Sequence, residues 1–123
     1  MDTRSKILTP AEAARLAGPV ALATGHFDVL RAAHVRVLDE LRRRAGGARL
    51  LAVVLPAPDE VLPQQARAEL VAALRVIDYV VIADAAEADR LADSLKPVEI
   101  VRLAAADALR ARELKEHVHS RQT

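Results

Sequence analysis

The chain contains no cysteine, which excludes disulfides, thiol nucleophiles and thiolate metal sites together. Aromatic side chains are nearly absent as well. Phe27 and Tyr79 are the only aromatic residues other than histidine, so the core must be built from aliphatic residues. The 18 lysine and arginine residues against 17 acidic ones leave a net charge of +1. We therefore expect no general attraction to nucleic acid or to anionic lipid.

Long apolar runs are also missing. No segment approaches the roughly 20 consecutive apolar residues that a membrane-spanning helix needs. Residues 1–6 lack the apolar core of a signal peptide. These absences predict a cytoplasmic protein with neither a membrane nor a nucleic acid as partner.

The composition otherwise suits a single folded domain over residues 1–123, because 52% of the residues are apolar. Residues 1–8 are polar and predict a flexible lead-in, and residues 104–123 have helical propensity. Between them, short apolar runs alternate with amphipathic segments. The predicted strands are Val20–Thr24, Arg49–Leu55, Asp78–Ala83 and Val98–Leu103, and the predicted helices are Pro10–Leu16, Leu30–Ala45, Pro63–Arg75 and Ala86–Leu95.

This alternation predicts an α/β fold, a Rossmann-like three-layer sandwich with a parallel sheet of four to five strands. Helical spacing places His34 on the inward face of the second helix together with Leu30, Val37, Leu38 and Leu41. The same argument places Ala66, Leu70, Ala73 and Leu74 on the inward face of the third helix.

The stretch Val20–Leu41 combines a buried strand, a turn containing Gly25 and the N-terminus of a helix. Free backbone N–H groups and the positive end of the helix dipole make such a turn a site for anions. Ligands of parallel sheets bind beyond the carboxyl ends of the strands, where strand order reverses. The turn at 24–28 is therefore the candidate site on grounds of fold alone.

The same stretch resembles the signature of the cytidylyltransferase-like nucleotidyltransferases, of the ADP-heptose synthase and glycerol-phosphate cytidylyltransferase type. That signature runs glycine, any residue, Phe-Asp, two residues, then His-x-Gly-His. Gly25, Phe27, Asp28 and His34 match it, whereas Arg31 occupies the position of the first histidine and Ala33 that of the second glycine.

The resemblance implies that the turn and its histidines hold a nucleoside triphosphate with Mg²⁺ while a phosphorylated substrate attacks the α-phosphorus. It assigns catalysis to His34 and Arg31, and it suggests a homodimer. It assigns nucleotide and phosphate binding to Thr24, Gly25, His26, Phe27, Asp28 and His34.

Each of these residues also has a purely structural interpretation. Gly25 could serve only the turn, because glycine tolerates positive φ. Asp28 could cap the helix, or lie near phosphate with Mg²⁺ offsetting its charge. His34 could contact phosphate or be a hydrogen-bonded core residue, and His26 is best explained as an exposed loop histidine. Arg31 could replace the missing histidine as a cation or be a solvated surface charge.

Other features limit the chemistry. The methyl group of Ala33 is either tolerated or blocks close approach of the nucleotide. His117 and His119 are spaced to point to different helix faces, so we predict no metal site there.

The segment Pro56–Leu62 carries no lysine or arginine, although the family has a long basic loop there. The Ser-Thr-rich closing segment of the family is missing too.

Two functional hypotheses follow. The first is an active nucleotidyltransferase that joins a nucleotidyl group to a phosphorylated sugar or alcohol. The second is a degenerate family member that keeps the scaffold and serves as a nucleotide-binding or assembly subunit. The broken motif favours the second, since each lost charge-assisted hydrogen bond costs roughly 1.5–3 kcal/mol.

Overall fold

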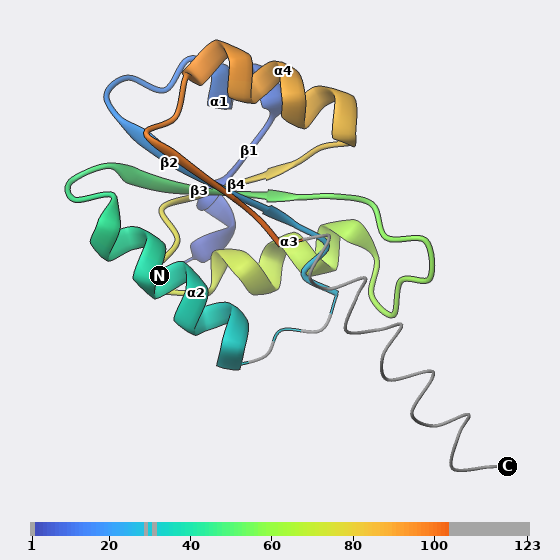
Figure 1. The fold of residues 1–123 in the computed structure, drawn as a ribbon. Coiled ribbons are helices and arrows are strands. Elements are labelled where there is room, and N and C mark those ends of the chain that lie inside the picture. The colour runs from blue at the N-terminus through green and yellow to red at the C-terminus, as the bar shows by residue number, and fades with distance from the viewer. Residues whose placement is uncertain (1, 29, 31, 104–123) are drawn as a thin grey trace, which may run out of the picture.

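The structure is a computed structural model that describes residues 2–28, 30 and 32–103, so Arg31, His117, His119 and the predicted helix over 104–123 lie outside the described residues (Figure 1). Its elements are η1 (Thr3–Lys6), β1 (Ile7–Leu8), α1 (Pro10–Ala14), β2 (Val20–Gly25), α2 (Ala32–Arg44), β3 (Arg49–Val54), α3 (Gln64–Ala72), β4 (Tyr79–Ile82), α4 (Ala85–Leu95) and β5 (Glu99–Arg102).

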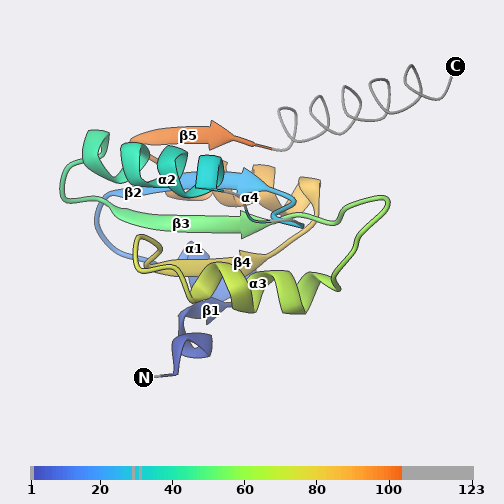
Figure 2. The same ribbon diagram turned by 90° about the horizontal axis from the view of Figure 1, so that it is seen from below.

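The strands form one five-stranded parallel sheet in the order β1-β4-β3-β2-β5. Helices α2 and α3 cover one face of this sheet, and α1 and α4 cover the other (Figures 1 and 2). The predicted three-layer α/β architecture is confirmed, and each predicted central strand is present within one or two residues of its expected bounds.

Strand β2 is the point at which strand order reverses. From β2 the chain steps to β3 and then to β4 in one direction, and it returns to place β5 on the opposite side of β2. Ligands of doubly wound sheets bind at the carboxyl end of such a strand. The fold therefore puts the turn after Gly25 where the sequence argument expects a site.

Side chains alternate between two cores along each strand. In β2, Ala21 and Ala23 face α2 and α3, whereas Val20 and Leu22 face α1 and α4. The near-continuous burial of β2 and β3 follows from this two-sided cover, as expected for a parallel sheet.

The prediction that residues 1–8 are a flexible lead-in is wrong for residues 3–8. Ile7 and Leu8 pair in parallel with Val80 and Val81 of β4. The Lys6 ammonium donates to the carbonyl oxygens of Leu74 and Ile77 at 3.2 and 2.9 Å. A two-residue edge strand is too short to produce a periodic pattern, so the polar composition around it concealed it.

The predicted inward faces of the helices are partly wrong. In α2, His34, Leu38 and Leu41 are buried as expected, but Val37 is 36% exposed. In α3 the predicted face is rotated, since Leu70 is 47% exposed. The residues of α3 that are buried are Arg67, Ala68, Val71 and Ala72. The predicted face counted apolar residues alone, so it could not include the buried Arg67.

Candidate functional site

The turn after β2 is fixed through its carbonyl oxygens. Three consecutive carbonyls, those of residues 24–26, accept hydrogen bonds from three different parts of the chain. Each carbonyl is thereby directed to its own donor, which fixes the path of the turn. The pairs are Leu103 N with Thr24 O at 2.7 Å, Leu55 N with Gly25 O at 2.8 Å, and Arg67 Nη1 with His26 O at 2.6 Å.

Gly25 is needed for close packing and not for positive φ, which corrects the structural interpretation made from the sequence. Its φ is outside the left-handed region, and it closes strand β2. A Cβ at this position would lie 3.1 Å from Cβ of Leu103 and 3.4 Å from the ring of Phe27. A larger residue at this position would require Leu103 to shift by a few tenths of an ångström.

Phe27 is the residue of the turn with a left-handed backbone, at φ 52°, and its side chain is 1% exposed. This conformation costs an ordinary residue about 1–2 kcal/mol. Burial of the ring in the core under α2 and α3 offsets that cost. The ring therefore fixes the path of the chain from β2 toward α2.

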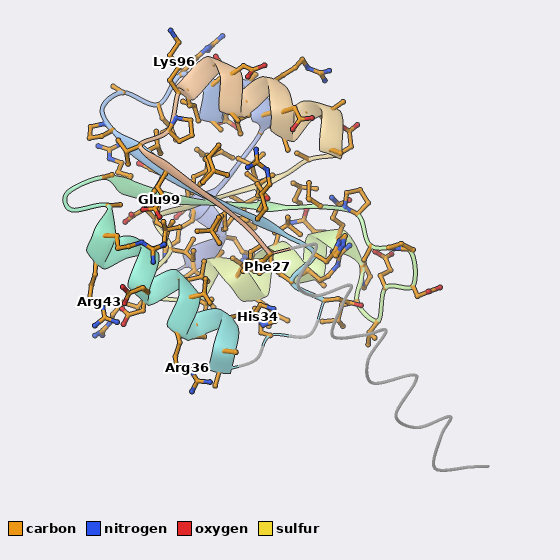
Figure 3. The ribbon with its side chains drawn as sticks, in the orientation of Figure 1. Phe27, His34, Arg36, Arg43, Lys96 and Glu99 are labelled. Atoms are coloured by element: carbon orange, nitrogen blue, oxygen red, sulfur yellow. The ribbon has the colours of Figure 1, made fainter. Side chains whose placement is uncertain are left out.

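His34 lies in the first turn of α2, facing the sheet, while Arg36 and Arg43 point away from it (Figure 3). It is 6% exposed, and its ring centroid lies 6.4 Å from that of Phe27, with 50° between the ring planes. The structure thus brings two residues of the resembled signature into contact distance. The expectation that His34 lies on the inward face is confirmed.

Asp28 holds the β3–α3 loop, which comprises residues 55–63. Its Oδ1 accepts from the backbone N–H groups of Val61 and Leu62, both at 3.0 Å, and its Oδ2 accepts from Val61 N at 2.8 Å. Partial burial alone raises the pKa of Asp28. The hydrogen bonds from Leu62 and Val61, and the nearby charges of Arg67 and His26, outweigh that effect and hold the pKa below its usual value.

Arg67 positions the turn, and the sequence pattern did not reveal this role. Its side chain is fully buried at 0% exposure, and it lies between the turn, the end of β3 and the β3–α3 loop. Ala68, Val71 and Ala72 form the apolar stripe beside it, and this stripe is the signal that could have identified the buried face. Besides His26 O, the guanidinium donates to Leu62 O at 3.0 Å, Leu55 O at 2.8 Å and Glu60 Oε2 at 2.8 Å.

The remaining predicted site residues divide into two groups. Thr24 comes two residues after Leu22 in β2, so both side chains lie on the face of the sheet that α1 and α4 cover. The Thr24 side chain therefore lies away from α2 and His34. His26 is partly buried, contrary to the exposed loop histidine expected. Its Nδ1 is buried and has no hydrogen-bond partner among the described residues. The turn therefore gathers His26, Phe27, Asp28 and His34, but not the Thr24 hydroxyl.

The electrostatic balance around the turn is not that of a strongly basic site. The β3–α3 loop carries Asp59 and Glu60 and no lysine or arginine. Within residues 2–28, 30 and 32–103, no three histidine, aspartate or glutamate side chains are grouped so that they could hold a metal ion. No helix in this same part of the chain is long and apolar enough to cross a membrane.

Comparisons with known proteins bear on the fold. No protein-family model matches the chain, and no curated protein matches it significantly. Among solved structures, the chain is similar to the lipopolysaccharide core biosynthesis protein from Thermoplasma volcanium GSS1, with 24% identity and a TM-score of 0.59. The match covers 67% of this chain and 71% of that chain. It supports the Rossmann-like architecture.

Proposed function

We propose that the protein is a nucleotidyltransferase-like domain that binds a nucleotide through its phosphoryl groups at the carboxyl end of β2. In this proposal it acts as a binding or assembly subunit. One observation supports it: Phe27, in the turn after the strand where sheet order reverses, lies beside His34 of α2, with ring centroids 6.4 Å apart, and both match the resembled signature.

The chemistry of the turn is compatible with an anionic ligand. Helix α2 has 13 residues and begins at Ala32, four positions after Asp28, and the dipole of a helix favours negative charge at its N-terminus. The carbonyl oxygens of residues 24–26 are bound by donors of the protein. A histidine in the first turn of the helix, His34, is suited to donate to a phosphoryl oxygen.

Nucleotidyl transfer is the second candidate. It is supported by the signature resemblance and by the description of the Thermoplasma volcanium neighbour as a biosynthesis protein. In that reaction the protein contributes positioning and charge stabilisation, with His34 facing the α-phosphoryl group. We rank it second because Arg31 and Ala33 depart from the signature and the β3–α3 loop lacks basic residues.

A thermal-shift titration tests the proposed binding. The ligands are the four nucleoside triphosphates with and without Mg²⁺ and the corresponding monophosphates. A ligand at about 100 times its Kd stabilises by about 2.7 kcal/mol, which raises the Tm of a domain of this size by several degrees. We expect His34→Gln to abolish the shift.

The matched control is Arg43→Gln, at the far end of the same helix, where Arg43 makes surface ion pairs with Asp39 and Glu40. It should leave the shift unchanged. No shift with any nucleotide at millimolar concentration, or an equal shift in the His34→Gln variant, would overturn the proposal. Pyrophosphate release from a triphosphate and a sugar phosphate would instead support the second candidate.

A further inference from the structure

Asp28 is the acidic residue of the turn over residues 24–28, where the resemblance implies Mg²⁺. Proteins commonly bind Mg²⁺ through one or two carboxylates together with phosphates of the substrate. The ion requires near-octahedral geometry and oxygen ligands at about 2.0–2.1 Å. Asp28 fits this role only if its carboxylate oxygens are available and the charges around it admit a dication.

The backbone of the β3–α3 loop already engages the carboxylate of Asp28. An ionised carboxylate offers about four positions at which it can accept a hydrogen bond. Oδ1 accepts from the N–H groups of both Val61 and Leu62 at 3.0 Å, and Oδ2 accepts from Val61 N at 2.8 Å. A cation that approached either oxygen would meet the positive ends of these N–H groups, and it would have to displace them to be bound by both oxygens.

The charges beside Asp28 are not those of a divalent cation site. The guanidinium of Arg67 is fully buried and is held to the carbonyl oxygen of His26, so it cannot move away from an incoming cation. Nη2 of Arg67 also pairs with Oε2 of Glu60 at 2.8 Å. Two carboxylates and one guanidinium leave a single net negative charge, which is insufficient to balance the charge of Mg²⁺.

The other oxygen atoms near the turn do not complete a metal site. The carbonyls of residues 24–26 each accept a hydrogen bond from the protein, and the donor to the last of them is the cationic guanidinium. In the part of the chain that the structure describes, no three histidine, aspartate or glutamate side chains are grouped to hold a metal ion. The oxygen atoms of the turn therefore do not fit the Mg²⁺ that the resemblance implies.

We infer that Asp28 is a positioning residue that holds the β3–α3 loop to the turn, and that it does not bind Mg²⁺. Arg67 holds the same loop at its two ends, through Leu55 O at 2.8 Å and Leu62 O at 3.0 Å. The turn and the loop are thus joined by a carboxylate from one side and by a guanidinium from the other. This assignment does not depend on nucleotide binding, so its failure would leave the proposed function intact.

Amide hydrogen exchange of the unsubstituted protein, followed by NMR, tests whether Mg²⁺ takes the carboxylate. We expect the amides of Val61 and Leu62 to exchange at the same rate in millimolar Mg²⁺ and in EDTA, because Asp28 keeps its N–H partners. Faster exchange of these two amides in Mg²⁺ would show that the metal displaces them from Asp28, and it would overturn the inference.

Mn²⁺ detects binding that leaves the hydrogen bonds in place, because this paramagnetic ion broadens the NMR signals of nearby amides. Asp59 is the matched carboxylate, since it is exposed and lies two residues before Val61. We expect either no broadening at Val61 and Leu62, or broadening that Asp59→Asn abolishes and Asp28→Asn retains. Saturable broadening that Asp28→Asn abolishes would overturn the inference, whether or not Asp59 contributes.

A second pair of variants tests the holding role. Asp28→Asn should speed exchange at Val61 and Leu62 about tenfold, because it removes charge-assisted hydrogen bonds to these amides. Asp84→Asn is the control, since Asp84 also accepts a backbone N–H group, that of Glu87 in α4, and it should leave exchange at Val61 and Leu62 unchanged. Unchanged exchange in the Asp28 variant, or equal acceleration in both variants, would overturn the holding role.

Discussion

Nη1 of Arg67 donates to the carbonyl oxygen of His26 across 2.6 Å, which joins the interior of α3 to the turn after β2. The same guanidinium binds the end of β3 and, through Glu60, the β3–α3 loop. A buried charge is tolerated only when its donors are satisfied and an opposite charge is near. The shape of the candidate site therefore depends on a residue that has no exposed surface.

We expect Arg67→Met to lower the free energy of unfolding by about 3–5 kcal/mol, because it leaves buried carbonyl oxygens without donors and Glu60 without its partner. Chemical denaturation in urea measures this change. Arg90→Met, at an exposed position of α4, is the control. Its free energy of unfolding should stay within about 0.5 kcal/mol of that of the unsubstituted protein. A loss below about 1 kcal/mol in the Arg67 variant would show that water replaces the guanidinium.

Gly25 and Gly47 make a second matched comparison. Gly25→Ala puts a methyl group 3.1 Å from Leu103 Cβ and 3.4 Å from the Phe27 ring. We expect this overpacking to lower the free energy of unfolding by about 1–3 kcal/mol. Gly47→Ala meets nothing within 4 Å, so it should be neutral or stabilise by up to about 1 kcal/mol. Equal urea midpoints for the two variants would contradict the packing role of Gly25.

Protonation of Asp28 should weaken the attachment of the β3–α3 loop. The pKa of Asp28 is lowered in the folded state, so its contribution to stability is present above the unfolded value of about 3.9 and is lost as the pH falls through the lower folded-state value. We expect Asp28→Asn to cost about 1–2 kcal/mol at pH 7. Denaturation at pH 7, 5 and 3 should show this difference shrinking toward low pH. A difference that stays constant with pH would exclude the carboxylate charge as its cause.

The sequence predicted the elements that have a repeating pattern. The apolar runs of β2 and β3 and the start of α1 at Pro10 were all identified correctly. Gly25 and His34 led to the strand-turn-helix segment as the candidate site, and that assignment stays a prediction. These features are local, so composition and spacing are sufficient to find them.

The long-range contacts were not predictable in this way. Burial of Arg67 depends on carbonyl groups supplied by residues 5, 12 and 41 positions away in the chain. The bond between Asp28 and Val61 crosses 33 positions, so its carboxylate appeared to be a helix cap or a phosphate neighbour. A hydrophobicity pattern contains no information about which distant oxygen or N–H group satisfies a polar side chain.

Restoring the signature by Arg31→His together with Ala33→Gly should not produce nucleotidyl transfer. Ala33 is half-buried in the first turn of α2, and glycine there costs up to about 1 kcal/mol of stability, so the doubly substituted chain should still fold. The engaged carboxylate of Asp28 and the acidic β3–α3 loop are unchanged by these substitutions, and they oppose a Mg²⁺-triphosphate. We therefore expect no pyrophosphate release with CTP or ATP, Mg²⁺ and a phosphorylated sugar or alcohol. Pyrophosphate release that requires both substitutions and disappears with His34→Gln would contradict this expectation. It would show that Arg31 and Ala33 alone prevent nucleotidyl transfer.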